Sequence, residues 1–186
     1  MIKKIPNLVS LARLLMIPVV FWCVLVDLYL FATLFIIAIA ISDLLDGFLA
    51  RYLNAETELG SYLDAVADKA FVISIFTLIG VLNLLPIFLI IVVISRDILI
   101  IGYFAIASLT NEEITFKPLF ISKFNTFFVF ILIIVTFADN LDEVNLQSIK
   151  YYLTPIVMLT TLFSLLSYIK LLSLIHISEP TRPREI

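Results

Sequence analysis

The stretch PIFLIIVVISRDILIIGYFAIASL, residues 86–109, decides the fold class of this chain. It has 24 residues, and Arg96 and Asp97 are the two that carry charge. About 20 predominantly apolar residues are enough for a helix to cross a bilayer, and lipid offers no partner to an unsatisfied backbone group. The stretch therefore predicts a membrane-spanning helix.

The rest of the chain repeats this pattern. Of its 186 residues, 62% are hydrophobic and 15% are charged, and the mean hydropathy is +1.16. Soluble domains are about 45–50% apolar and about 25% charged, so the composition excludes a water-soluble globule. We expect an all-α polytopic membrane protein with one membrane domain at residues 1–171. Its six spans are predicted from the apolar runs 8–26, 29–50, 64–82, 86–109, 124–138 and 151–171.

Basic residues predict the orientation of the spans, because the cytoplasmic flanks of membrane helices retain Lys and Arg. With the N-terminus and the C-terminus in the cytoplasm, Lys150 lies outside. Eight basic residues then lie at or near the cytoplasmic side: Lys3, Lys4, Arg13, Arg51, Lys69, Lys117, Lys123 and Lys170. Nothing before Pro6 resembles an Arg-rich mitochondrial presequence, so we expect a bacterial inner membrane.

Four acids end the second run and open the third. Asp43 and Asp46 are three residues apart, and Asp64 and Asp68 are four apart, so each pair shares one helical face. In the predicted topology both pairs reach the same cytoplasmic depth. Four close carboxylates repel one another unless cations neutralise them, and oxygen ligands suit Mg²⁺ or Mn²⁺. Two such ions could clamp a diphosphate during a displacement reaction.

Glycine and arginine accompany the four acids. Gly47 and Gly60 have no Cβ, which would let a flat base or a phosphate approach the helix backbone, and Arg51 could bind a phosphate. Two other interpretations stay open. The acids could be solvated helix ends, or they could relay protons in a small ion-coupled transporter.

These residues resemble the signature of the CDP-alcohol phosphotransferase family. The stretch DLLDGFLAR at 43–51, eight further residues, and GSYLDAVAD at 60–68 fill every position of that signature. Eight fixed identities at fixed spacing are far more specific than a lone glycine motif.

The resemblance implies a six-helix fold, a homodimer, an active site at the cytoplasmic membrane surface, and no nucleic-acid partner. It implies that an acceptor hydroxyl attacks CDP-diacylglycerol and that CMP leaves. Asp68 would also be the base for the acceptor hydroxyl. The resemblance further implies that two divalent cations are bound by Asp43, Asp46, Asp64 and Asp68. It implies that CDP is contacted by Gly47, Arg51 and Gly60.

Two segments bear on the acceptor alcohol. Ile94–Asp97 (ISRD) and residues 116–126 (FKPLFISKFNT) resemble the CDP-alcohol type of cardiolipin synthase, which transfers to phosphatidylglycerol. Val129 departs from that resemblance, because those enzymes carry Gln there. Phosphatidylglycerophosphate synthases, which use glycerol 3-phosphate, carry Arg-Glu in the first segment and a Gly-Lys version of the second.

The acceptor-site candidates are Arg96, Ser122, Lys123 and Asn125, and each has an alternative interpretation. Arg96 needs a partner inside the membrane, which could be Asp97 or a lipid phosphate. Lys123 could snorkel to the interface instead of binding phosphate. Ser122 and Asn125 could be helix-contact residues.

The last residues of the chain have a separate explanation. The sequence LSLIHISEPTR at 172–182 resembles the translation of a transposon adaptor used in preparing sequencing libraries. We expect residues 172–186 to be a non-native tail, and His176 to have no function.

Overall fold

The computed structural model describes the backbone of residues 5–52, 58–110, 120–141 and 144–177, and the side chains of 11–42, 66–102, 121–141 and 144–170. All regular structure in those ranges is helical, which confirms the predicted all-α class. The helices are α1 (Ile5–Leu25), α2 (Tyr29–Tyr52), α3 (Glu58–Val81), α4 (Ile87–Thr110), α5 (Phe120–Ala138) and α6 (Gln147–Ile177).

Several helices are longer than the predicted runs. The third begins six residues before the predicted Asp64, and the fifth begins at Phe120 instead of Phe124. Polar residues in a first turn lower the mean hydropathy of the run, but the helix still includes them because its backbone hydrogen bonds form there. The predicted tail starts inside α6, and residues 178–186 lie outside the described residues.

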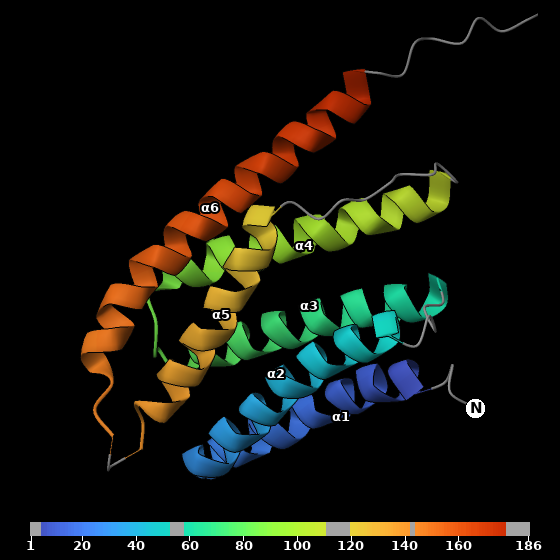
Figure 1. Cartoon of the computed structure of the whole chain (residues 1–186). Helices are drawn as coiled ribbons and strands as arrows, with labels where there is room; N and C mark the ends of the chain where they lie inside the picture. The colour runs from blue at the N-terminus through green and yellow to red at the C-terminus, as the bar shows by residue number, and fades with distance from the viewer. Residues whose placement is uncertain (1–4, 53–57, 111–119, 142–143, 178–186) are drawn as a thin grey trace, which may run out of the picture.

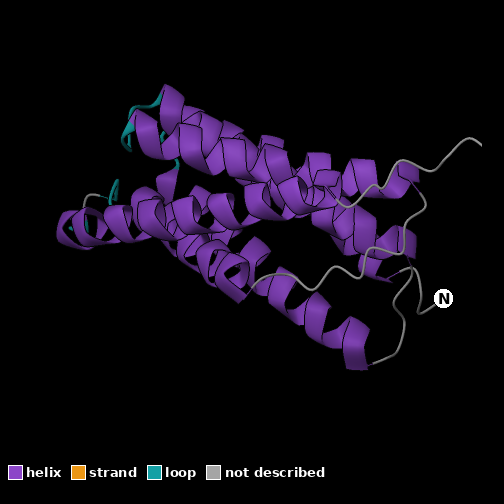
Figure 2. Cartoon of the chain, turned by 90° about the horizontal axis from the view of Figure 1, so that it is seen from above, coloured by secondary structure: helices purple, strands orange, loops and turns teal. Residues whose placement is uncertain are grey.

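The six helices contact one another in a closed ring. In order around it, α1 packs on α2, α2 on α5, α5 on α6, α6 on α4, α4 on α3, and α3 on α1. Figure 1 shows α1 to α4 running in similar directions with α5 and α6 inclined to them more steeply, and Figure 2 shows the same helices from above. The ring encloses a core of large apolar side chains, among them Phe71, Phe76, Leu132, Ile133 and Phe137.

The turns that follow α1 and α3 are built alike. Asp27 and Asn83 adopt left-handed backbone conformations, with φ of 60° and 55°. In each turn the following residue donates its backbone N–H to a carbonyl five residues earlier, at 2.8 Å from Leu28 to Cys23 and 3.1 Å from Leu84 to Ile79. This arrangement ends a helix with its last carbonyls satisfied.

The helix ends alternate between two sides of the molecule. Figure 1 shows the turns after α1, α3 and α5 on one side, and the N-terminus with the facing ends of α2 and α3 on the other. The predicted acidic positions therefore lie on helix ends that meet on a single side.

Two helices of the described residues have the length and composition to cross a membrane by themselves, at Ile121–Ala138 and Gln147–Lys170. Shorter apolar helical segments lie at Leu11–Leu25 and Tyr29–Ser42. The six helices are thus observed, while six membrane crossings and the cytoplasmic placement of both termini stay predictions.

Candidate active site

The acidic motif is divided between two helices. Asp43, Asp46, Gly47 and Arg51 belong to the last part of α2, and Gly60 and Asp64 belong to the first turns of α3. The side chains of these six residues lie outside the described ones. No group of three or more potential metal-ligating side chains occurs within the side chains that are described.

Asp68 is the motif residue whose side chain the structure describes. It is 16% exposed, and its Oδ2 accepts a hydrogen bond of 2.9 Å from Nζ of Lys69. Its Oδ1 is buried and has no hydrogen-bond partner among the described groups. A buried carboxylate oxygen is costly to leave unsatisfied. Oδ1 is therefore suited to bind a cation or to accept a hydrogen bond from a hydroxyl group.

A chain of buried charges leads away from Asp68. Nζ of Lys69 lies 3.8 Å from Oδ1 of Asp97 in α4, and Nη1 of Arg96 donates to that same oxygen at 2.5 Å. Charges of opposite sign thus alternate from Asp68 to Arg96. The four formal charges sum to zero, which lets them share an apolar interior.

Arg96 connects this chain to two further helices. Its Nη2 donates to Oγ of Ser122 in α5 at 2.5 Å, and its Nε donates to Oγ of Ser164 in α6 at 3.3 Å. The hydroxyl of Tyr168 donates to Oγ of Ser122 at 3.2 Å. Arg96 is 2% exposed, and its partner inside the bundle is Asp97, one of the two that the sequence suggested.

Asn125 lies one turn beyond Ser122 on α5 and is completely buried. Its Oδ1 accepts hydrogen bonds from Thr160 at 2.9 Å and Thr161 at 2.7 Å, both on α6. Its Nδ2 is buried without a partner in the described part of the chain. Lys123, by contrast, is exposed, so three of the four acceptor candidates face the interior and the fourth faces outward.

The sequence did not single out Lys69, Ser164 or Tyr168 as site residues. In the sequence, Lys69 indicates only the orientation of its span, although an ionisable residue inside a predicted span is itself a signal of function. Ser164 and Tyr168 are four residues apart and so share one face of α6, but small polar residues are common in membrane helices.

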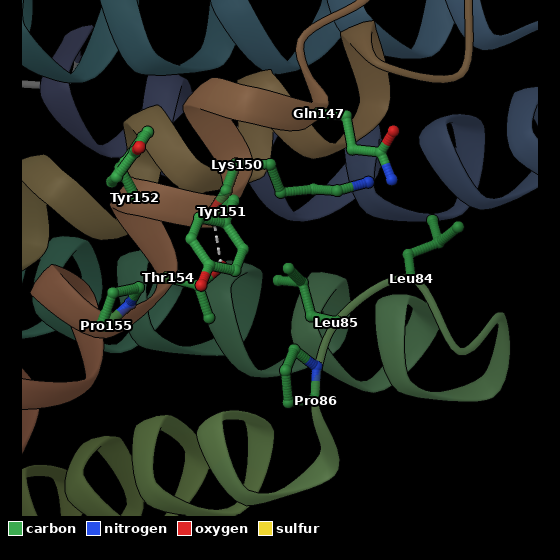
Figure 3. A pocket seen from close by; sticks show the side chains of 9 residues that line it. All are labelled: Leu84, Leu85, Pro86, Gln147, Lys150, Tyr151, Tyr152, Thr154 and Pro155. Carbon is green, nitrogen blue, oxygen red and sulfur yellow. Dashed lines mark hydrogen bonds between the residues drawn. The ribbon is translucent and has the colours of Figure 1, made fainter.

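A hollow of about 520 Å³ lies at the other end of the bundle, between the turn after α3 and the start of α6. Figure 3 shows Tyr151 and the extended side chain of Lys150 among its lining residues. The rise of about 1.5 Å per residue puts Leu84 and Asp68 about 20 Å apart along α3 and its turn. The hollow is therefore separate from the candidate active site.

Lys150 pairs with Asp139 beside that hollow. The backbone N–H of Leu146 also donates to Asp139, at 2.9 Å. The hydrogen bond from Lys150, more than any other influence, lowers the pKa of Asp139 below its ordinary value. This ion pair fastens the turn between α5 and α6.

Comparison with known proteins identifies the signature. The family model for CDP-alcohol phosphatidyltransferase matches residues 3–166. The chain belongs to the CDP-alcohol phosphatidyltransferase family. The match confirms the family that the motif at residues 43–68 predicted. Members of this family are membrane enzymes of phospholipid synthesis.

Individual relatives of this family member carry two different names. The chain is 35% identical over 165 residues to a CDP-diacylglycerol–glycerol-3-phosphate 3-phosphatidyltransferase of Aquifex aeolicus, covering 84% of this chain and 88% of the relative. It is 32% identical to a chloroplastic protein of the same name from Oryza sativa, covering 89% and 56%. It is 31% identical to a cardiolipin synthase (CMP-forming) of Rattus norvegicus, covering 77% and 54%. The chain thus spans about half the length of the last two relatives.

Proposed function

We propose that this chain transfers the phosphatidyl group of CDP-diacylglycerol to a hydroxyl group of phosphatidylglycerol, which yields cardiolipin and CMP. The observation that carries the proposal is the buried chain of contacts from Asp68 through Lys69, Asp97 and Arg96 to Ser122. It connects the last acid of the family motif to both segments that resemble cardiolipin synthases.

The motif would supply the metal and nucleotide sites. Two divalent cations, Mg²⁺ or Mn²⁺, would be held by Asp43, Asp46, Asp64 and Asp68. The unpartnered Oδ1 of Asp68 is suited to be a ligand of such a cation. Bound cations would neutralise the diphosphate and the charge that develops during transfer. The nucleotide contacts would come from Gly47, Arg51 and Gly60, which share the same helix ends.

The proposed transfer is one displacement at phosphorus. The acceptor hydroxyl oxygen bonds to the lipid-side phosphorus of CDP-diacylglycerol, and the bond from that phosphorus to the oxygen bridging it to CMP breaks. The hydroxyl proton passes to Asp68, and CMP departs with the bridging oxygen. Asp68 contacts Lys69, whose Nζ lies 3.8 Å from Oδ1 of Asp97 in α4, so a group bound beside this ion pair would come close to Asp68.

The acceptor would bind at the end of the charge chain. Asn125 offers its buried amide N–H groups to a glycerol hydroxyl or a phosphate, and Ser122, one turn earlier on α5, is bound by Arg96 of α4. The chain of Lys69, Asp68, Arg96 and Asp97 carries no net charge. This favours a singly charged lipid phosphate over the more highly charged glycerol 3-phosphate, whose binding needs surplus positive charge. The exposed Lys123 could meet the lipid phosphate at the membrane surface.

Glycerol 3-phosphate is the second candidate acceptor, which would make the chain a phosphatidylglycerophosphate synthase. The relative from Aquifex aeolicus, which carries that activity in its name, favours this candidate because it aligns with this chain over most of both lengths. Whichever acceptor it uses, we propose that the chain is a homodimer in a bacterial inner membrane, with its active site on the cytoplasmic side.

Separate assays with each acceptor test the proposal. Purified protein receives labelled CDP-diacylglycerol with phosphatidylglycerol or with glycerol 3-phosphate, and CMP and the lipid product are measured. We expect CMP release and cardiolipin with phosphatidylglycerol. Product formed with glycerol 3-phosphate alone would overturn the cardiolipin assignment. Solute uptake into liposomes without CMP release would instead support the transporter interpretation.

The Asn125→Leu variant tests the acceptor site. We expect KM for phosphatidylglycerol to rise about tenfold or more, because one or two hydrogen bonds are lost, with KM for CDP-diacylglycerol little changed. Thr154→Val is a matched control, since Thr154 bonds to the carbonyl of Lys150 at the far end of α6. Equal KM values in Asn125→Leu and the wild type would exclude Asn125 from acceptor binding.

A further inference from the structure

Lys69 has no assigned part in metal binding, nucleotide binding or proton transfer. It follows Asp68 directly, and its side chain is 12% exposed in a bundle of apolar helices. An ammonium group is expensive to bury unless it is paired, so its position calls for a physical reason.

The contacts of Lys69 supply that reason. Its Nζ is shared between Oδ2 of Asp68 at 2.9 Å and Oδ1 of Asp97 at 3.8 Å. Asp97 is 1% exposed and is bound by Arg96. Arg96 is fixed in turn by the hydroxyl groups of Ser122 and Ser164. Lys69 therefore bridges a rigid buried ion pair of α4 to a carboxylate at the candidate active site.

The bridge acts on the two oxygens of Asp68 differently. Lys69 binds Oδ2, whereas Oδ1 has no hydrogen-bond partner among the described groups. An aspartate carboxylate can rotate, and a fixed cation on one oxygen stops that rotation. We infer that Lys69 is a positioning residue, which holds Oδ2 of Asp68 against α4 so that Oδ1 is presented to the reacting groups.

This inference rests on the proposed function, because it takes Asp68 as a metal ligand and as the base for the acceptor hydroxyl. It also makes a distinctive prediction. A lysine beside a carboxylate repels divalent cations, so its removal should not weaken metal binding. Loss of position should nevertheless lower turnover, because a group held near a metal ligand orients that ligand.

The experiment compares Lys69→Met with the wild type, using the full chain purified in detergent. We measure kcat with CDP-diacylglycerol and phosphatidylglycerol, and we measure Mn²⁺ binding by electron paramagnetic resonance without substrates. We expect kcat to fall by about 10–100-fold, which is typical when a group that orients a metal ligand is removed. The dissociation constant for Mn²⁺ should be equal to or lower than that of the wild type.

Three further variants sharpen the result. Lys69→Arg keeps the charge and the reach, so it should recover most of the kcat. Lys150→Met removes a lysine of the ion pair at the other end of the bundle and should leave kcat unchanged. Asp97→Asn weakens the bridge from the opposite side and should lower kcat with Mn²⁺ binding retained, which keeps the test available if Lys69→Met does not fold.

The double variant Lys69→Met/Asp97→Asn tests whether the two residues act through one bridge. It should be no slower than Lys69→Met, whereas multiplied losses would overturn the bridge. Full kcat in Lys69→Met, or weaker Mn²⁺ binding together with a lower kcat, would also overturn the inference. A wild type that releases no CMP with any acceptor would refute the proposed function instead, and weaker Mn²⁺ binding in Lys69→Met would then still overturn the role of Lys69.

Discussion

At the scale of single residues, the candidate active site is a problem of buried charge. Lys69, Arg96 and Asp97 lie inside the bundle, and each has a neighbour of opposite charge within 4 Å. Breaking such a pair leaves one charge uncompensated, which is more harmful than removing both. The series of ion pairs ends at Asp68, whose Oδ1 is the one buried carboxylate oxygen without a hydrogen-bond partner among the described side chains.

Asp68→Asn tests the role of that oxygen. The amide has almost the same shape and can still accept a hydrogen bond from Lys69, but it neither takes up a proton nor binds a metal ion as strongly. We expect kcat for CMP release to fall at least about 100-fold, with an unchanged helical circular dichroism spectrum. Asp27→Asn, in the turn after α1 at the other end of the bundle, is the control. Near-normal turnover in Asp68→Asn would refute the proposed base.

At the scale of the elements, polar side chains stabilise the ends of α1, α3 and α5, where many helices use glycine instead. Asp27 and Asn83 hold positive φ angles at the ends of α1 and α3. Their short polar side chains tolerate this conformation better than branched ones do. Asp139 fastens the end of α5 in another way, through Lys150 and the backbone of Leu146.

Asn83→Val should destabilise the turn between α3 and α4. A β-branched residue at φ 55° costs about 1–2 kcal/mol, which lowers the melting temperature by about 2–4 °C per kcal/mol in a chain of this size. Asn83→Gly is the matched variant, because glycine adopts this conformation without strain and should melt at or above the wild-type temperature. Equal melting of the valine and glycine variants would contradict the argument.

The Asp139–Lys150 pair should make stability depend on pH. Lys150 lowers the pKa of Asp139 in the folded state, so the pair stabilises the fold above the unfolded pKa of about 4 and loses this effect as pH falls through the folded pKa. Asp139→Asn should therefore cost about 1 kcal/mol at pH 7 and progressively less below pH of about 4. Thermal melts across pH measure the gap, and a gap that stays constant down to pH of about 2 would rule the linkage out.

At the scale of the whole molecule, the helix ring brings distant parts of the chain together. Lys69 and Asp97 belong to neighbouring helices, while Arg96 meets Ser122 and Ser164 from helices later in the chain. The acidic motif lies on the facing ends of α2 and α3, on the same side as the N-terminus (Figure 1). A metal site there would tie α2 to α3 and so stabilise the bundle.

Removal of metal should therefore affect both activity and stability. EDTA should stop CMP release, and Mg²⁺ or Mn²⁺ should restore it. Free metal at about 100 times its dissociation constant should stabilise the fold by about 2.7 kcal/mol, seen as a higher melting temperature. Asp43→Asn should lose most of this metal-dependent rise, whereas Asp139→Asn should keep it. Full activity in excess EDTA would exclude the metal mechanism.

Much of the fold and part of the candidate site could be predicted along the chain. Helix number and type follow from the length of the apolar runs, because an unsatisfied backbone is too costly in lipid. The family follows from fixed identities in residues 43–68, and family membership is confirmed by the match over residues 3–166. Helix ends were less predictable, because the first turns of α3 and α5 contain polar residues.

The sequence by itself therefore determined the helical class, the family and the set of acids that carry the proposed chemistry. Only the tertiary structure decided which helices are neighbours and that Lys69 bridges Asp68 to Asp97. The physical reason is that lipid and protein interior are equally apolar, so hydropathy does not distinguish them. Phe76 is completely buried and Phe88 is 72% exposed, although both lie in apolar helices. The pairing of charges depends on distances between helices, and those distances exist only once the bundle has packed.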